Sequence, residues 1–442
     1  MTLRVHPDDI VASSTSPVLG KHDSWERVRL GEVADLLNGF AFKSAQFSHE
    51  GVVPLLRIRD VGSSGTQIGY SGDYDPRYIV KAGTIVVGMD GDFRAARWRG
   101  PPALLNQRVC AITVRNPSLY DESFLLYALP GYLDAIHDQT SSITVKHLSS
   151  ETINEIPLPL PPLAEQRRIV TAIEEQLSRL DAASASLAAA VRRLDVCRGQ
   201  FVEDTMHGEW PSTTLGEIAE IAGGVTKDAK RQTDPAFVEV PYLRVANVQR
   251  GFLDLREVTT IRVPAEKAVA LRLEVGDVLF NEGGDRDKLG RGWVWSGEIE
   301  GCIHQNHVFR ARLCHGFDPK FVSWHGNTFG RDWFERHGRQ TTNLASLNLT
   351  TLKAFPVPVP PLEEQQRIVA GLEARLSVLN TLRGAVERAQ RRSTSLRRAV
   401  LDRAFRGELV PQDPLDEPAS VLLDTIRSER EAAPVRRRRV QA

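Results

Sequence analysis

Two loops of the sequence carry basic side chains between glycine residues, at matching places in two similar halves of the chain. The loop at 92–100 follows a TIVVG segment, and the loop at 283–293 follows the corresponding DVLFN segment. Arginine can pair bidentately with guanine or phosphate, and glycine lets a loop follow a groove. We therefore favour DNA contact over a merely solvated surface. The side chains concerned are Arg94, Arg97 and Arg99 in the first loop, and Arg286, Lys288 and Arg291 in the second.

Further basic or amide side chains stand at equivalent points of the two halves. They are Lys43, Arg57 and Arg59 in the first half, and Lys227, Lys230, Arg231, Arg244 and Asn247 in the second. We add these positions to the predicted DNA-binding set. The net charge of zero, from 56 basic and 56 acidic residues, argues mildly against a nucleic-acid binder. It does not exclude one, because binding needs a local basic face rather than a global excess.

Familiar catalytic motifs are absent from the sequence. It contains no GxxxxGKS or GxxxxGKT phosphate loop, no GxGxxG after a strand, no HExxH, no GxSxG, and no Asn-Pro-Pro-Tyr or Asp-Pro-Pro-Tyr of the adenine-methylating type. We therefore predict that the chain is not itself an enzyme. One alternative is a metal-dependent nuclease built on Asp277, Glu282 and the loop at 285–288. Another is a scaffold whose two halves bind protein rather than DNA.

A cluster of Cys302, His304 and His307, with Cys314 and His315 beyond it, is the one metal-like pattern. In a strand, Cys302 and His304 share a face and His307 does not. The spacing fits no familiar zinc site, so we predict no metal ligands. The four cysteines are scattered without a CxxC pair, which fits free thiols in a reducing cytoplasm.

A segment that occurs twice must position these loops. It reads PLPLPPLAEQRRIV from Pro157 and PVPVPPLEEQQRIV from Pro356, 199 positions later, and the same offset still pairs Gly208 with Gly407. A segment that keeps its length while its side chains change is under a length constraint, as a rod would be. Apolar residues at steps of three and four after Leu163 predict a helix of about 45 residues, ~65 Å long, with a coiled-coil seam.

The second rod begins with the same seam, but its apolar residues then shift to Leu382 and Leu396, which we interpret as a stammer. One narrow apolar stripe on each helix needs a partner, and the two copies are the obvious pair. Because the first rod leads from the first half to the second, the second rod must return antiparallel. We predict an α+β fold: two similar mixed domains joined by an antiparallel coiled coil with pseudo-two-fold symmetry.

The sequence also indicates where these parts begin and end. We predict a flexible N-terminal tail at 1–22, a domain at 23–160, a rod at 161–208, a second domain at 209–359, a second rod at 360–407, and a C-terminal tail at 408–442 with a short helix and a basic end. Within the domains, helices are expected near 122–137 and 319–337. The chain has no apolar run of membrane-spanning length and no secretory signal, so we expect a cytoplasmic protein.

The repeated PPLxEQ motif, a Trp-x(4)-Leu-Gly-Glu opening in each half, and the RGELVPQDP segment after the second rod resemble the specificity subunit of bacterial type I restriction–modification systems. The resemblance covers nearly the whole chain. It implies two target recognition domains, each reading one half of a bipartite, usually asymmetric double-stranded DNA site, with rods that set the spacing. It implies a non-catalytic subunit that holds no cofactor of its own.

The same resemblance implies partners. Two methyltransferase subunits would dock on the rods and use S-adenosylmethionine, and motor/nuclease subunits would join where the system also restricts DNA. Base-reading residues vary with the target in that family, so only rod residues can be transferred. The rod positions expected to form the coiled coil or dock subunits are Leu163, Gln166, Arg168, Ile173, Leu177, Leu180, Leu362, Gln365, Arg367, Leu372, Leu376 and Leu379.

Overall fold

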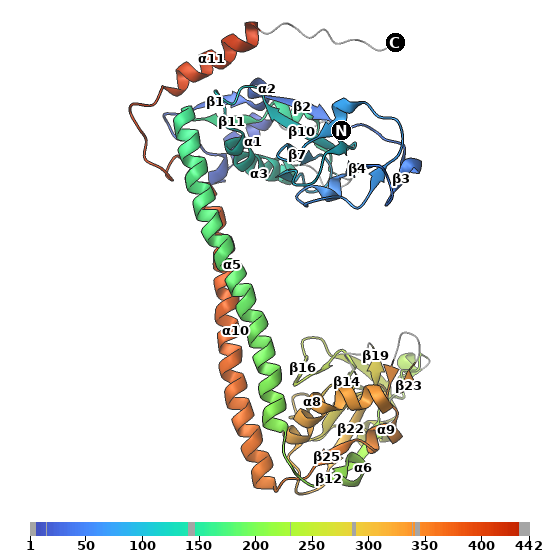
Figure 1. Ribbon diagram of the computed structural model, residues 1–442. Helices are drawn as coiled ribbons and strands as arrows, with labels where there is room; N and C mark the ends of the chain where they lie inside the picture. The colour runs from blue at the N-terminus through green and yellow to red at the C-terminus, as the bar shows by residue number, and fades with distance from the viewer. Residues whose placement is uncertain are drawn as a thin grey trace. The chain divides into compact units, whose positions relative to one another are not determined.

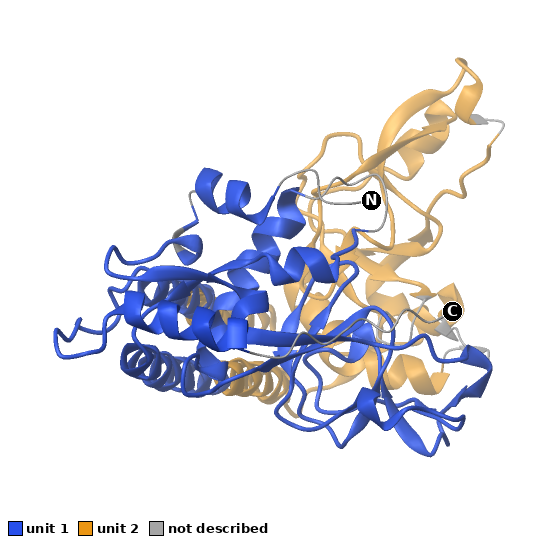
Figure 2. Ribbon diagram, turned by 90° about the horizontal axis from the view of Figure 1, so that it is seen from above, with its two compact units in different colours: residues 1–186, 389–442 blue, residues 187–388 orange. Residues whose placement is uncertain are grey.

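The computed structural model describes residues 6–14, 16–139, 146–229, 231–284, 289–337, 339–340 and 345–432. Two compact units divide the chain: unit 1 holds residues 1–186 and 389–442, and unit 2 holds residues 187–388 (Figure 2). Each unit consists of one globular domain and half of each of two long helices, α5 (Leu163–Met206) and α10 (Leu362–Phe405). The predicted α+β fold with two long helices is confirmed.

Each domain contains a four-stranded antiparallel sheet with the same strand order. The order is β2-β10-β7-β8 in unit 1 and β13-β22-β18-β20 in unit 2. The strand bounds are β2 (Ala34–Asn38), β7 (Ile85–Gly88), β8 (Ala95–Arg97), β10 (Val109–Val114), β13 (Ala219–Gly223), β18 (Val278–Asn281), β20 (Gly292–Val294) and β22 (Val308–Leu313). The central strands β7 and β18 are buried throughout, as expected of apolar strands covered on both faces.

A second sheet in each domain contains a parallel pair, β4 with β9 in unit 1 and β14 with β21 in unit 2. The sheet orders are β3-β5-β4-β9-β6 and β17-β14-β21, and two-stranded pairs β1–β11 and β12–β25 join the ends of each domain. The bounds are β1 (Glu26–Arg29), β3 (Phe47–Ser48), β4 (Val53–Leu56), β5 (Gly69–Tyr70), β6 (Ile79–Val80), β9 (Ala103–Leu105), β11 (Pro157–Leu160), β12 (Ser212–Thr214), β14 (Val238–Leu243), β17 (Thr259–Val263), β21 (Ile303–His304) and β25 (Pro356–Pro358). The duplication seen in the sequence is therefore a duplication of fold.

The remaining elements are short, apart from one helix in each domain and a 14-residue helix in the C-terminal segment. The helices α3 (Glu122–Gln139) and α8 (Pro319–His337) lie where the sequence predicted them. The others are α1 (Pro7–Ser13), α2 (Leu30–Val33), α4 (Ser150–Asn154), α6 (Leu215–Ile218), α7 (Ala265–Ala270), α9 (Leu349–Lys353) and α11 (Ala419–Ala432), with β15 (Val248–Gln249), β16 (Phe252–Leu253), β19 (Gly283–Gly284), β23 (Arg339–Gln340) and β24 (Ala345–Ser346).

The helices α5 and α10 lie side by side and antiparallel (Figure 1). In unit 1, Ser184 Oγ lies 3.1 Å from Ser393 Oγ, and Asp181, three residues earlier, accepts from Arg397, four residues later. In unit 2, Asp195 accepts from Arg383. As the residue number rises along α5, the number of the facing residue on α10 falls, so the two helices run in opposite directions.

The predicted stammer in the second rod is wrong. Leu382 and Leu396 are exposed, at 48 % and 43 %, and do not belong to the seam. Positions at regular steps of three and four continue the seam instead: Leu376 and Ser393 are buried, and Arg383 is half-buried and pairs with Asp195 of α5. The helix keeps one register, because the apolar residues near both of its ends fix it and the middle of the seam is polar.

The predicted flexible N-terminal tail is also wrong for the described residues 6–14 and 16–22. Helix α1 places Ile10 in the core of the globular domain of unit 1, which we call domain 1, and the domain of unit 2 is domain 2. The turn at Pro17–Leu19 buries Val18 and Leu19 in the same core. Val18 packs on α3 at Gly131, where a Cβ would lie 2.3 Å from Val18 Cγ1. A glycine at that helix position therefore admits the N-terminal segment.

The C-terminal segment after α10 folds onto the same domain. Helix α11 buries Leu422, Leu423 and Ile426 in the core of domain 1, so the short helix predicted for this tail is present. The basic run at 436–439 lies outside the described residues. Among the helices of the described part of the chain, none combines the length and apolar content that crossing a bilayer needs.

Candidate nucleic-acid interface

Four predicted DNA-binding side chains of domain 1 lie on its surface. They are Lys43, Arg59, Arg94 and Arg99. None of these side chains makes a hydrogen bond or ion pair with another residue in the described ranges. They are therefore available to an anionic ligand.

Two buried aromatic residues hold the loop that carries Arg94 and Arg99. Phe93 is 1 % exposed at a φ of 40°, and the Trp98 indole donates to the Pro101 carbonyl oxygen at 2.7 Å. A backbone bond from Gly88 N to Arg94 O, at 2.9 Å, closes the turn. The two aromatic side chains anchor the loop in the domain, and the neighbouring Arg94 and Arg99 remain exposed. The sequence of the loop does not show which of its side chains point inward.

Arg97 departs from the predicted DNA-binding role. Its guanidinium donates to the Gly83 carbonyl oxygen at 2.9 Å and the Ser123 hydroxyl at 2.9 Å, and it pairs with Glu122 at 3.3 Å. Arg97 thus ties β8 to the start of α3. The reason is its place on a strand edge beside a helix N-terminus, where a carboxylate and a hydroxyl are available.

Three more residues of the predicted DNA-binding set, Arg57, Arg244 and Asn247, lie in equivalent turns after β4 and β14. The Asp60 carboxylate accepts from the Arg57 backbone N–H at 3.0 Å, and Asn247 Oδ1 accepts from the Arg244 N–H at 2.9 Å. Asn247 is 3 % exposed and donates to the Asp254 and Glu257 carbonyl oxygens, both at 2.9 Å. Its amide is used up within the fold, which contradicts a base-reading role. The side chains of Arg57 and Arg244 are half-buried and pair with Asp60 and Glu257.

The remaining positions of the second half divide into two groups. Lys227 is exposed, and Arg291 is half-buried and donates to the Val245 carbonyl oxygen at 3.2 Å. Lys230, Arg286 and Lys288 lie outside the described residues, and for Arg231 only the backbone is described. These four positions stay predictions.

The glutamine of each PPLxEQ motif joins a long helix to its own domain. Gln166 donates to the Pro161 carbonyl oxygen at 2.9 Å and accepts from the Asp121 N–H at 2.8 Å. Gln365 repeats this with Pro360 at 2.9 Å and Asp318 at 2.8 Å. Both side chains are buried at 0 % exposure. The expected docking role is therefore wrong for these two residues, because their amides are enclosed by the fold.

The other rod positions fall into three groups. Ile173, Leu177, Leu372, Leu376 and Leu379 pack into the hydrophobic cores where the rods meet α3 or α8, and Leu180 is half-buried along the rod. Leu163 is half-buried and Leu362 is 39 % exposed. Arg168 is paired with Asp416 at 2.6 Å, whereas Arg367 lies on the surface beside Glu364. Leu362 and Arg367 are thus the most accessible of the predicted docking residues.

Several residues of the nuclease and zinc alternatives have structural partners, and the nuclease loop at 285–288 lies outside the described residues. Asp277 is 1 % exposed and accepts from Arg312 at 2.8 Å, and Glu282 pairs with His307. His304 lies 2.6 Å from the Val308 carbonyl oxygen, and burial lowers the pKa of His304 to about 4. Across the described ranges, no group of three or more His, Cys, Asp or Glu side chains is placed to hold a metal ion.

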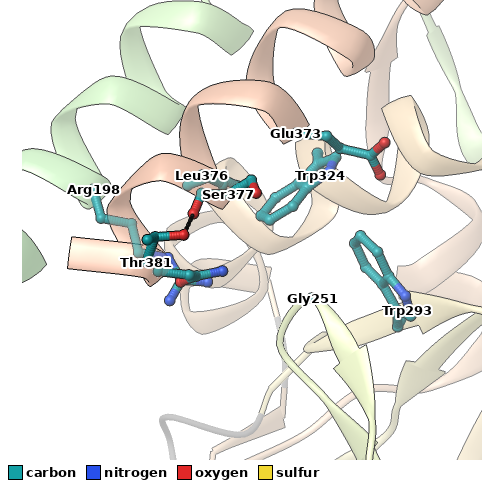
Figure 3. A pocket seen from close by; sticks show the side chains of 9 residues that line it. Arg198, Gly251, Trp293, Trp324, Glu373, Leu376, Ser377 and Thr381 are labelled. Carbon is teal, nitrogen blue, oxygen red and sulfur yellow. Dashed lines mark hydrogen bonds between the residues drawn. The ribbon is translucent and has the colours of Figure 1, made fainter. Parts of the chain in front are cut away.

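A hollow of about 550 Å³ in unit 2 lies where the two long helices meet the domain (Figure 3). Trp293 and Trp324 form its domain side, with ring centroids 5.2 Å apart at 79°, and Arg198 lies on the helix side. Its single carboxylate, Glu373, is paired with Lys320 at 2.6 Å. The described residues that line the hollow include no histidine and no carboxylate other than Glu373.

Comparison with known proteins agrees with this geometry. The family described as type I restriction modification DNA specificity domain matches residues 22–187 and 330–386. The chain is 32 % identical to the type I restriction enzyme EcoBI specificity subunit of Escherichia coli over 96 % of both chains. It is 21 % identical to the EcoKI specificity subunit of Escherichia coli strain K12, over 93 % of this chain and 96 % of that one.

Solved structures share the fold. A chain described under complex assembly and conformational transition of the type I R-M system aligns with a TM-score of 0.64, at 18 % identity over 87 % of this chain and 98 % of that chain. The HsdS subunit from Thermoanaerobacter tengcongensis aligns with a TM-score of 0.54, at 18 % identity over 88 % and 98 %. These structures show the fold, and the family match together with the 32 % identity over 96 % of both chains shows that the chain belongs to the family of type I restriction–modification DNA specificity subunits.

Proposed function

We propose that each globular domain reads one half of a bipartite double-stranded DNA target, and that the two half-sites differ in sequence. The observation that carries this proposal is the pair of domains with one strand order and different basic side chains on their matching loops. Since specificity in this family belongs to a non-catalytic subunit, the chain supplies recognition and no reaction step. The expected partners are other subunits of a type I complex and DNA.

In domain 1, the exposed and unpaired basic residues are the proposed DNA contacts. Lys43, Arg59, Arg94 and Arg99 have no described partner that DNA would have to displace. A rigid loop loses little conformational entropy when it binds, and the buried Phe93 and Trp98 supply that rigidity. In domain 2, Lys227 is the exposed counterpart. Phosphate contacts would fix the position of each domain, and base contacts would specify the half-site.

We also propose the assembly and its cofactor. Two methyltransferase subunits, each with S-adenosylmethionine, would dock on the chain and methylate adenines, and motor/nuclease subunits would complete a restricting complex. The cytoplasm is the expected compartment, because the DNA target lies there. The long helices, 44 residues each, would fix the distance between the two half-sites.

The experiment that tests the distance proposal shortens both helices together. Removing residues 187–193 from α5 and the facing residues 385–391 from α10 takes out one heptad and keeps the seam. Seven residues correspond to about 10 Å of helix, or about three base pairs at ~3.4 Å each. We expect the methylated target to keep both half-site sequences and to lose about three base pairs of spacer. An unchanged spacer, read by sequencing methylated DNA, would contradict the proposal that the long helices fix the distance between the half-sites.

A second experiment tests the assignment of half-sites. Replacing Arg94 and Arg99 by alanine should relax or weaken recognition of one half-site and leave the other unchanged. The matched control removes two exposed arginines of α5, Arg192 and Arg193. Equal loss at both half-sites, or a loss as large in the control, would remove this loop from the interface.

A further inference from the structure

The two copies of the PPLxEQxR motif have different surroundings. In unit 1, Glu165 accepts from the Gln412 amide at 2.6 Å and from the Trp25 indole at 3.0 Å. Arg168 donates to both carboxylate oxygens of Asp416, at 3.1 and 2.6 Å. Gln412 and Asp416 belong to the segment that follows α10. The chain's own C-terminal segment therefore occupies both charged groups of the first motif.

The Glu165 side of this site is buried, whereas 35 % of the Arg168 side chain remains exposed. Glu165 and Trp25 are each 1 % exposed, and Leu409 and Val410 of the covering segment pack against the core of domain 1. Burial raises the pKa of Glu165 above its ordinary value, against the lowering effect of its hydrogen bonds to Gln412 and Trp25. The segment thus contributes two polar contacts, four residues apart, and two aliphatic side chains.

The corresponding site in unit 2 is open. Glu364 and Arg367 are bonded to each other, at 2.9 and 2.6 Å, and 74 % of the Arg367 side chain is exposed. Trp210, the counterpart of Trp25, is half-buried. A groove of about 330 Å³ runs past these residues, and its other lining residues are Phe201, Thr205, His207, Ile368, Gly371 and Arg375.

The two sites differ because the chain takes different paths after the two long helices. After α10, the chain continues through Gly407 into the irregular segment at 408–416, which packs on unit 1. After α5, the chain turns at Gly208 and enters β12 within a few residues. In the described part of unit 2, no other segment hydrogen-bonds to the side chains of Glu364 and Arg367, although the unit keeps the residues that would receive one.

We propose that this groove of unit 2 binds an extended segment of the methyltransferase partner that carries a side-chain amide and a carboxylate four residues apart. The amide would donate to Glu364, as Gln412 does to Glu165, and the carboxylate would pair with Arg367, as Asp416 does with Arg168. Arg375 lines the groove and favours an acidic segment by charge. The identity of the partner rests on the proposed function, whereas the chemistry of the segment rests on the occupied site.

The first test measures assembly of the methyltransferase subunit with variants of the full chain. Arg367→Ala should weaken assembly by about ten- to hundredfold, the usual cost of losing a hydrogen bond to a charged group. Arg388→Ala is the matched control, because Arg388 is another exposed arginine of α10 that lies outside the groove. Assembly of Arg367→Ala at the strength of this control would overturn the proposal.

The second test uses a peptide of residues 407–417 as a competitor for the methyltransferase subunit. We expect the wild-type peptide to reduce assembly and a peptide with Asp416→Asn to compete at least tenfold more weakly. Absence of competition, or equal competition by the two peptides, would overturn the proposal. Sequence-specific DNA binding by the chain is measured in parallel. If the wild-type chain binds DNA specifically and Arg367→Ala assembles as well as the wild type, only this docking inference fails. If the wild-type chain shows no sequence-specific DNA binding, the proposed function itself is refuted.

Discussion

Replacing Gln365 by leucine tests whether the PPLxEQ glutamine holds a long helix to its domain. The buried amide of Gln365 donates to the carbonyl oxygens of Pro360 at 2.9 Å and Gly316 at 3.3 Å, and it accepts from the Asp318 N–H at 2.8 Å. Asp318 in turn accepts from the backbone N–H groups of the first turn of α8. The substitution therefore removes three bonds and loosens the residue that caps α8.

The expected cost follows from these contacts. Each hydrogen bond contributes about 1 kcal/mol net, and a buried group left without a partner costs about 1–3 kcal/mol. Leucine has a similar volume and keeps the packing, so cavity formation adds little. We expect Gln365→Leu to lower the free energy of unfolding of unit 2 by about 3 kcal/mol.

Urea unfolding monitored by tryptophan fluorescence suits this measurement, because most of the seven tryptophans lie within residues 187–388. Gln366→Leu is the control: the neighbouring glutamine lies on the same helix and is exposed. We expect the control to change stability by less than about 0.5 kcal/mol. If both variants unfold at the same urea concentration, and Gln365→Leu instead weakens subunit assembly, then the docking role first predicted from the sequence is right and our interpretation is wrong.

Three further predictions concern other parts of the molecule. In urea unfolding, Leu376→Ala should lower the free energy of unfolding by about 2–5 kcal/mol and Leu382→Ala by less than about 0.5 kcal/mol, because Leu376 is buried and Leu382 is exposed. Equal losses for the two variants would support the stammer. Burial raises the pKa of Glu165, so folded-state stability should fall as pH rises from the ordinary carboxyl value through the raised one; Glu165→Gln should flatten that decline, and parallel pH profiles would speak against it. If Arg94 and Arg99 both contact phosphates, their double alanine variant should reduce the salt dependence of DNA binding by about two ions, measured as the slope of log affinity against log salt.

The sequence by itself determined the architecture. The fixed 199-residue offset, the proline pair before each rod and the steps of three and four predicted two long helices, and α5 and α10 have these properties. Antiparallel pairing followed from connectivity alone. These features are local or periodic, so side-chain type and spacing suffice to specify them.

Sequence reasoning was less able to assign individual side chains. Arg97 and Arg94 lie three residues apart in the same loop, yet Arg97 is held by Glu122 and Ser123 while Arg94 is exposed. Asn247 belongs to the predicted DNA-binding set, but its amide is enclosed in a turn. In each case the partner comes from how the loop folds, which residue type does not reveal.

Only the tertiary structure decided which copy of the repeated motif is occupied. Glu165 and Glu364 stand at the same position of the PPLxEQ motif, but Glu165 accepts from Gln412, 247 residues away, while Glu364 accepts from Arg367 of its own helix. Likewise, Leu382 and Leu396 look like seam residues, but the phase imposed by the packed ends of α10 turns them outward. Long-range contacts choose among side chains that local chemistry makes equivalent, because the free energy of burial depends on what covers a residue as well as on the residue itself.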